Sequence, residues 1–129
     1  MCSSDLTENQ LAAWFSFTLP GASASGLSHM MGKQIGARHG IPHGVTSCLL
    51  LPHVMRYLGE KMPERVALLG KATGSGDAAG DIQRLIASLG LPQHIAEFGL
   101  GDSELRRAAS ELGGMYPSAD LLRIYMDAK

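Results

Sequence analysis

The sequence is short of the features that mark several classes of protein. Only 18% of its 129 residues are charged, and 11 Lys and Arg nearly balance 12 Asp and Glu, to a formal net charge of −1. A near-neutral chain lacks the clustered basic charge with which proteins bind nucleic acids or anionic membranes. We therefore expect no nucleic acid and no membrane among its partners.

Cysteine and long apolar runs are also scarce. The two cysteines are Cys2 and Cys48, and with one of them near the chain end a disulfide framework is not expected. The longest apolar run, at residues 48–52, is far shorter than the ~20 residues that span a bilayer. The first ten residues lack the basic and apolar regions of a secretory signal. These absences predict a cytoplasmic protein.

Glycine and apolar residues, by contrast, are plentiful. The 16 glycines exceed the roughly 7% that is usual, and 45% of the residues are apolar although only 5% are aromatic. A chain of this length buries about two-thirds of its unfolded surface, so one domain folds without a disulfide or a metal. We predict a single domain over residues 1–129 with an aliphatic core and closely packed helices or tight turns.

Apolar residues recur at helical spacing along most of the chain, separated by Gly and Pro. One stripe comprises Ala24, Leu27, Met31 and Ile35, and another comprises Ile82, Leu85, Ile86 and Leu89. Gly32 and Gly36, within the first of these segments, would let another backbone approach closely. No alternation of period two and no internal repeat is present. We predict an all-α fold of about six to eight helices.

The apolar segment at residues 45–57 allows two interpretations. Its length favours a helix with a kink or break at Pro52, because proline removes a backbone donor. A short apolar run is also typical of a buried strand, here over residues 45–51.

Four of the five histidines fall between positions 29 and 53. His29 lies in the helix rich in small residues, and His43 lies just inside the start of the next predicted helix. If these helices pack as a hairpin, both imidazoles point into the same space, and imidazole suits Zn, Fe, Co or Ni. Two histidines hydrogen-bonded to backbone groups would explain the same spacing. We expect structural or surface positions for His39, His53 and His94.

Three segments carry a resemblance to a known family. They are GLSHMMGKQIGA at residues 26–37, IPHGV at residues 41–45 and LLPHVMRY at residues 50–57. In this order they resemble the signature region of the iron-containing (group III) alcohol dehydrogenases, in particular the branch that includes maleylacetate reductases. LGLP at residues 89–92 and FGL at residues 98–100 extend the similarity, which covers residues 11–128.

The resemblance implies an α/β domain that binds NAD(P), followed by an all-helical domain that carries a metal. In the family an Asp and a His of an earlier helix and two further His hold this metal. His29 and His43 resemble the last two ligands, which implies a site for a divalent ion, Fe or Zn. Four residues after the first of them, where the family usually has another His lining the active site, this sequence has Lys33.

The sequence departs from the family in what it omits. It contains no nucleotide-binding domain, and no D-x-x-x-H that would supply the two other ligands. NAD(P) is therefore not expected to bind this chain alone, and the metal site is incomplete. We interpret the chain as a truncated, stand-alone relative of the helical metal-binding domain, without dehydrogenase activity alone, that acts as a folded binding or interaction module.

Two alternatives belong to other classes of protein. In one, the chain is the metal-binding half of a split NAD(P)-dependent alcohol dehydrogenase or maleylacetate-type reductase, and a separate chain binds the nucleotide. In the other, it is a small metal-binding protein that uses His29 and His43. Truncation would also expose apolar surface, so a homo-oligomer is expected. Trp14, Phe15 and Phe17 are candidates for its contact, unless they close the core of this chain.

Overall fold

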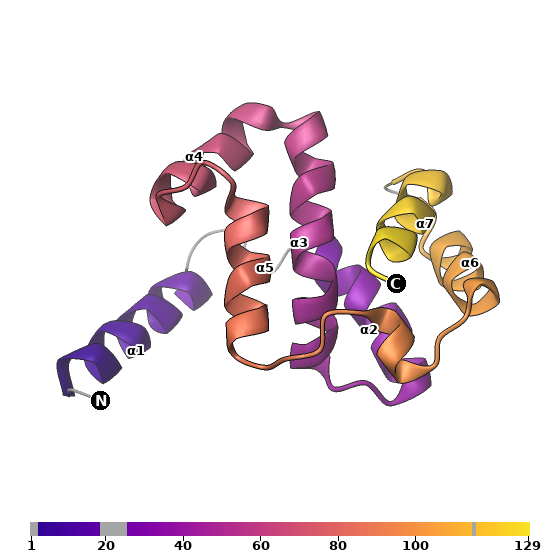
Figure 1. Cartoon of the computed structure of the whole chain (residues 1–129), viewed down its shortest axis with the longest axis horizontal. Helices are drawn as coiled ribbons and strands as arrows, with labels where there is room; N and C mark the ends of the chain where they lie inside the picture. The colour runs from indigo at the N-terminus through magenta and orange to yellow at the C-terminus, as the bar shows by residue number, and fades with distance from the viewer. Residues whose placement is uncertain (1–2, 19–25, 115) are drawn as a thin grey trace.

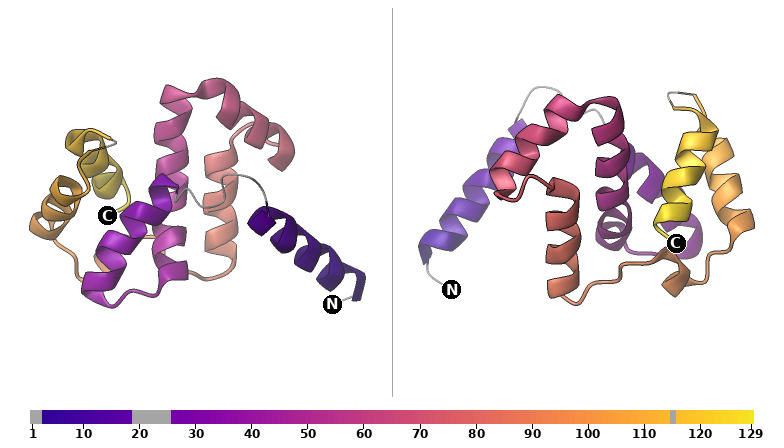
Figure 2. Two further views of the ribbon diagram at one scale, coloured as in Figure 1. Left: turned by 180° about the vertical axis from the view of Figure 1, so that it is seen from behind. Right: turned by 45° about the horizontal axis from the view of Figure 1, so that its top comes forward.

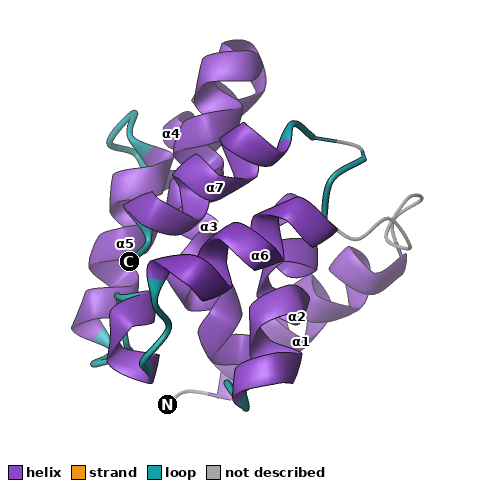
Figure 3. Cartoon of the chain, turned by 90° about the vertical axis from the view of Figure 1, so that its right-hand side faces the viewer, coloured by secondary structure: helices purple, strands orange, loops and turns teal. Residues whose placement is uncertain are grey.

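The computed structural model describes residues 3–18, 26–114 and 116–129, and all regular structure in these ranges is helical (Figure 3). The α-helices are α1 (Ser3–Thr18), α2 (Leu27–His39), α3 (His43–Lys61), α4 (Pro63–Thr73), α5 (Ala78–Ser88), α6 (Asp102–Glu111) and α7 (Ser118–Asp127). A short 3₁₀ helix, η1 (Ile95–Phe98), joins α5 to α6. The predicted all-α fold of six to eight helices is confirmed.

The central element is α3. It packs against α2, α4, α5 and α7, and α6 packs against both α7 and α2. In Figure 1 α5 stands beside α3, α4 crosses above the two, and α6 and α7 lie together on the other side of α3. Helix α1 projects from one side of this group, as both views of Figure 2 also show. The helices packed around α3 therefore fix the position of both its ends. One of these ends carries His43.

The core between α2, α3, α6 and α7 is mainly aliphatic, as the composition predicts. Its fully buried side chains include Met31, Ile35, Leu49, Leu50, Ile95, Leu105, Leu121, Ile124 and Tyr125. Burying each large apolar side chain stabilises the fold by about 1.5–3 kcal/mol. The Tyr125 hydroxyl donates a hydrogen bond to the backbone oxygen of Met31 at 2.8 Å, which ties α7 to α2.

Helices α2 and α3 approach closely because two glycines of α2 leave room for one side chain of α3. Thr46 is completely buried there. A Cβ atom at Gly32 would lie 2.8 Å from the Thr46 Oγ1, and one at Gly36 would lie 3.1 Å from the Thr46 Cγ2. The predicted close approach at these two glycines is confirmed, and the group that approaches them is the threonine side chain.

The helical interpretation of residues 45–57 is confirmed, and the alternative of a buried strand over residues 45–51 is excluded, because these residues form part of α3. The helix continues through Pro52 without the break that was one of the two expected effects of this proline. Proline lacks the N–H that would bind the carbonyl four residues earlier, which costs the helix one hydrogen bond. Leu50 and Val54, on either side of it, are buried in the core, and this tertiary packing stabilises the helix across the missing bond.

The predicted apolar stripe of α5 faces inward only in part. Ile86 is buried, and Ile82 packs on the small cluster formed by Met55 and its neighbours. Leu85 and Leu89, however, are 53% and 63% exposed. Helix α4 likewise exposes more than half of the side chains of Leu68 and Leu69, so these two helices leave apolar groups at the surface.

Some predictions concern residues outside the described ranges. Ala24 lies there, and the structure describes no side chain for Phe15 or Phe17. The side chain of Trp14 is described, and it is 61% exposed, so it does not close the core. No helix in the described part of the chain is long and apolar enough to cross a membrane.

The last residues are held against the core. The backbone N–H of Ile95 donates to the carbonyl of Ala128 at 2.9 Å, and that of Ala96 donates to the carbonyl of Lys129. Ala128 is completely buried, and the Lys129 ammonium forms an ion pair with Asp102. These contacts join η1 and α6 to the end of α7.

Candidate functional site

His29 and His43 come from consecutive helices. His29 lies in the first turn of α2, and His43 is the first residue of α3. Between them, α2 ends at His39 and is followed by Gly40, whose φ of 65° is a left-handed conformation that glycine adopts without strain. The chain then doubles back along α2, so that the Ile41 carbonyl lies 3.1 Å from where a Cβ of Gly36 would be. Helix α3 therefore begins beside the middle of α2, and the two histidines meet.

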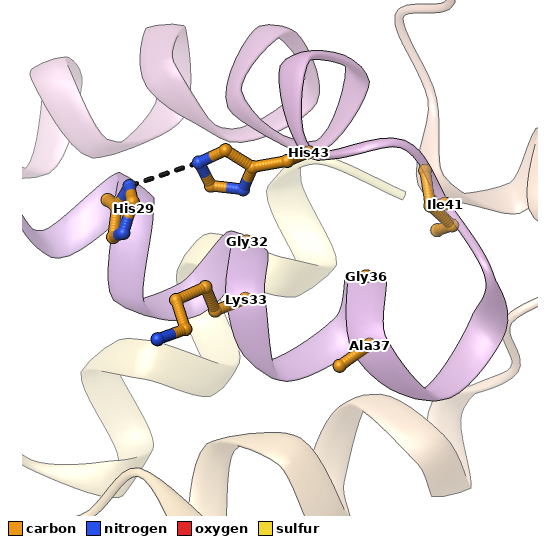
Figure 4. Close-up of a pocket in the computed structure, with 7 residues that line it drawn as sticks. All are labelled: His29, Gly32, Lys33, Gly36, Ala37, Ile41 and His43. Atoms are coloured by element: carbon orange, nitrogen blue, oxygen red, sulfur yellow. Dashed lines mark hydrogen bonds between the residues drawn. The ribbon is translucent and has the colours of Figure 1, made fainter.

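The two imidazoles face each other, as Figure 4 shows. The distance from His43 Nε2 to His29 Nδ1 is 3.1 Å, and the ring centroids are 4.6 Å apart with an angle of 81° between the ring planes. A hydrogen bond forms across this distance when one nitrogen carries the proton and the other accepts it. The alternative interpretation requires each ring to be hydrogen-bonded to a backbone group. Among the described residues, neither ring has such a bond.

The same distance suits two ligands of one metal ion. An imidazole nitrogen lies about 2.0–2.1 Å from Zn²⁺, so two nitrogens at adjacent corners of a tetrahedron or octahedron lie about 2.8–3.4 Å apart. The 3.1 Å between the two imidazoles falls within this range. Within residues 3–18, 26–114 and 116–129, no group of three or more His, Cys, Asp or Glu side chains suits a metal. The residues present therefore fit half of a metal site.

A pocket of about 530 Å³ lies beside the imidazoles. Its lining consists of His29, Gly32, Lys33, Gly36, Ala37, Ile41 and His43 (Figure 4). This volume is within the range of about 300–1,000 Å³ that is usual for small-molecule sites. Its polar side chains are the two imidazoles and one ammonium group, and the other walls are apolar or bare backbone.

Lys33 is the only charged residue among the described residues that line this pocket. It follows His29 by one helical turn on the same face of α2, and the two side chains leave the helix on the same side in Figure 4. The Lys33 side chain is exposed and forms no hydrogen bond or ion pair with any described residue. The site thus places an unpaired positive charge beside the two imidazoles.

The remaining histidines lie outside this pocket, in the structural and surface positions that the sequence predicts. His39 ends α2 and is exposed, and His94 is exposed before η1, where its backbone N–H donates to the Glu97 carboxylate at 2.9 Å. His53 is half-buried in α3, and this burial, followed by the nearby Arg56 charge, lowers its pKa.

The sequence analysis missed a polar cluster that fastens α2 to α6. The Glu111 carboxylate accepts hydrogen bonds from Arg38 and Gln34 of α2 and from Arg107 of its own helix. The hydrogen bond from Arg38, which has the largest influence, and the one from Arg107 lower the pKa of Glu111. Only the Arg107–Glu111 spacing of four residues is visible in the sequence, because the partners on α2 lie 73 and 77 positions away. The cluster holds the helix that carries His29.

Comparison with known proteins shows which family has a similar sequence. Residues 7–113 match the family described as Fe-containing alcohol dehydrogenase family, C-terminal. The chain is 32% identical over 90 residues to the 1,3-propanediol dehydrogenase of Klebsiella pneumoniae, a match that covers 61% of this chain and 23% of that protein. It is 27% identical over 106 residues to the maleylacetate reductase of Sphingobium indicum, covering 81% of this chain and 30% of the reductase.

Solved structures of such proteins share the fold. The alcohol dehydrogenase from Oenococcus oeni matches 95% of this chain and 36% of its own, with a TM-score of 0.77 and 25% identity. A 1,3-propanediol oxidoreductase matches 81% of this chain and 32% of its own, with a TM-score of 0.73 and 27% identity. The chain therefore spans between 23% and 36% of the length of these relatives.

Proposed function

Because the chain belongs to the Fe-containing alcohol dehydrogenase family and matches its C-terminal part, we propose that it provides the helical half of a metal-dependent oxidoreductase site. The observation that carries this proposal is the 3.1 Å distance between the ring nitrogens of His29 and His43 at the edge of a pocket. A nucleotide-binding domain, on a separate chain or on a further segment of the same protein, contributes the NAD(P) site and the other metal ligands. Without that domain the 129 residues form a folded binding module that has no dehydrogenase activity.

In this proposal His29 and His43 bind a divalent ion, Fe or Zn, through the two nitrogens that face each other. Such an ion, when bound, polarises a substrate oxygen as a Lewis acid. Thr46 helps to position the second ligand, because its Oγ1 donates to the His43 carbonyl at 2.8 Å while its side chain lies in the space left by Gly32 and Gly36. Ala37 and Ile41 add apolar surface beside the same place.

The test is the metal content of the purified chain. Tag-free protein is incubated with Fe(II) or Zn(II), desalted and analysed for bound metal, and we expect retention of about one ion per chain or per two chains. His29→Ala and His43→Ala each remove a ligand and reduce retention to background. His39→Ala serves as the matched control, because this exposed histidine ends α2 outside the pocket, and it leaves retention unchanged. Absence of retained metal, or equal retention in all three variants, would contradict the proposal.

The oxidoreductase part of the proposal has a test of its own. NAD(P)-linked oxidation of alcohols is measured for the chain alone and for the chain mixed with a nucleotide-binding domain of the family. We expect no activity from the chain alone and measurable activity in the mixture, lost again with His43→Ala. Activity of the chain alone would show that the nucleotide binds these 129 residues.

A second candidate function is metal binding between two copies without redox chemistry. It is favoured by the count of two imidazole ligands, which a two-fold axis would double to the four of a closed Zn site. This arrangement predicts one ion per two chains and a dimer that dissociates in the His29→Ala variant. One ion per chain on a monomer would exclude it.

A further inference from the structure

We propose that a second pocket, between α3 and α5, binds a tetrahedral oxyanion such as phosphate, and that Arg56 is the main group that holds it. Arg56 lies about 20 Å further along α3 than His43, at 1.5 Å per residue. Among the described residues, none lines both this pocket and the one beside the imidazoles. Binding of an anion here is therefore independent of the metal and of the proposed function.

Three segments of the chain supply the lining of this pocket. Arg56 comes from α3, Gln83 and Arg84 come from α5, and Gln93 lies between α5 and η1. Helices α3 and α5 pack side by side in Figure 1, which brings these groups to one place. The pocket therefore contains two guanidinium groups and two side-chain amides, all of which carry N–H donors. The remaining lining residues are Asp77, Gly80 and Ala87.

The guanidinium of Arg56 is held in place by a neutral group. Its Nη2 donates to the side-chain oxygen of Gln83, and among the described residues it forms no ion pair with a carboxylate. Other arginines of the protein do form such pairs, namely Arg38, Arg84, Arg107 and Arg123. The Nε and Nη1 of Arg56 therefore remain for a ligand, in the fork geometry that suits an oxyanion.

The second guanidinium of the pocket is only partly occupied. Arg84 donates from Nη2 to Asp81 within α5, and its Nη1 lies 3.2 Å from where a Cβ of Gly80 would be. One carboxylate, that of Asp77, also lines the pocket, and its Oδ1 accepts from the Gly80 N–H as the cap of α5. The lining therefore offers more N–H donors than acceptors, and Arg56 supplies the unpaired charge.

The number of donors indicates a tetrahedral oxyanion. A carboxylate has two oxygens, which the fork of one arginine satisfies, whereas phosphate presents oxygens in four directions. The donors of this pocket belong to four side chains from three segments, which suits the second kind of ion. The volume of about 280 Å³ lies just below the range of about 300–1,000 Å³ that is usual for small-molecule sites. A free phosphate ion or the phosphoryl group of a phosphomonoester fits this space.

His53 provides a reporter of binding within the protein. It lies one turn before Arg56 in α3. Burial lowers the pKa of His53 most, the Arg56 charge lowers it further, and Asp127 raises it, while His94 lowers it to a smaller extent. An anion bound to Arg56 offsets the guanidinium charge, so the pKa of His53 should rise on binding.

The experiment is an NMR titration of the 129-residue protein with sodium sulfate. Sodium chloride keeps the ionic strength constant, so that screening does not change. Sulfate keeps its charge over the pH range in which His53 titrates. We expect saturable shifts of the His53 ring and Gln83 side-chain amide signals, and a higher pKa of His53 at saturation than in chloride alone.

Substitutions of arginine test which group holds the anion. Arg56→Gln should weaken sulfate binding about fivefold, as for a partly exposed ion pair. Arg56→Lys keeps the charge without the fork, and its affinity should fall between those of Arg56→Gln and the wild type. Arg106→Gln is the matched control, because this exposed arginine of α6 lies outside the pocket, and it should leave binding unchanged. Thermal melting checks the fold of Arg56→Gln, which the exposed position should leave intact.

Further titrations distinguish the sources of the anion. Inorganic phosphate, glycerol phosphate and acetate are compared at about pH 8, where phosphate is mainly a dianion. Tighter binding of glycerol phosphate supports the phosphoryl group of a larger molecule as the ligand, and tighter binding of inorganic phosphate supports the free ion. Three results would overturn the proposal: shifts that do not saturate, acetate binding as tightly as sulfate, and equal binding of sulfate by Arg56→Gln and Arg106→Gln.

Discussion

Among single residues, Thr46 has the largest structural influence on the site. Its hydroxyl group is bonded to the His43 carbonyl, and its side chain lies against Gly32 and Gly36. The residue is completely buried, and in the described ranges no buried polar side-chain atom lacks a hydrogen-bond partner. The position of the first turn of α3, and with it the distance between the imidazoles, therefore depends on the absence of side chains at two positions of α2.

Gly32→Ala tests this dependence. The added Cβ would lie 2.8 Å from the Thr46 Oγ1, so the helices have to separate, and we expect a loss of about 1–3 kcal/mol in the free energy of unfolding. Gly59→Ala in α3 is the control, because its nearest neighbour is the Val66 Cγ1 at 3.8 Å. Without a clash, alanine should stabilise the helix by about 0.5–1 kcal/mol. Urea unfolding measures the free energy of unfolding of both variants. If the two substitutions changed it in the same direction, the result would contradict the packing of Thr46 against Gly32.

Tyr125 predicts a dependence of stability on alkaline pH. Burial raises its pKa above the ordinary value of 10.0. Below pH 10 the hydroxyl keeps its proton in both states, whereas above it only the unfolded chain ionises, so stability falls as the pH rises. Tyr125→Phe should reduce this slope and cost about 1 kcal/mol at neutral pH through the lost bond to Met31. Urea unfolding from pH 8 to about 11 measures how the free energy of unfolding depends on pH. Burial also raises the pKa of Tyr57, so the Tyr125→Phe variant should keep part of the slope.

At the scale of helices, α5 shows that a periodic sequence does not determine which side chains become buried. Asp77 caps the helix by accepting a hydrogen bond from the Gly80 N–H at 3.0 Å. Of the stripe itself, Ile86 is buried and Leu85 is 53% exposed. Helix α5 packs against α3 and α4, and this packing buries Ile86 but leaves Leu85 mostly in water.

Alanine substitutions should separate these two positions. Ile86→Ala removes buried methyl groups and should cost about 2–5 kcal/mol in the free energy of unfolding. Leu85→Ala alters a side chain that is mostly in water, and its effect should stay within about 0.5 kcal/mol. Chemical unfolding of the two proteins measures this contrast. Similar losses would show that another surface covers Leu85 in solution.

Local signals in the sequence predict some elements well and others poorly, for physical reasons. Pro63 occupies the first position of α4, where its missing N–H is not needed, so this helix start has a signal in the sequence. The effect of Pro52 was not predictable from its own chemistry, because packing of Leu50 and Val54 on distant helices decides it. The juxtaposition of His29 and His43 was anticipated through the helical segments and the family resemblance.

At the scale of the whole molecule, the notable feature is an apolar surface on α4 and α5 that no described helix covers. Leu68 and Leu69 of α4, Leu85 of α5 and Leu89 directly after α5 are all more than half exposed. Exposed apolar groups of this kind favour association, and a formal net charge of −1 provides little repulsion between copies. The homo-oligomer expected from the sequence remains a prediction, and these helices are where we expect its contact.

Size-exclusion chromatography with light scattering tests the oligomer. We expect a species larger than one chain that becomes smaller on dilution. The double variant Leu68→Gln and Leu85→Gln should shift the equilibrium towards the monomer, whereas Met126→Gln changes a 37% exposed methionine of α7 and should not. A monomer in the wild type, or a larger effect of the α7 substitution, would contradict the expected contact.

The contacts of the last two residues determine how the protein is best handled. The carbonyls of Ala128 and Lys129 accept the backbone N–H groups of Ile95 and Ala96, and Ile95 is completely buried. Any shortened form of the protein should keep both residues, because a variant that lacks them leaves the Ile95 amide without its acceptor and should loosen η1 first.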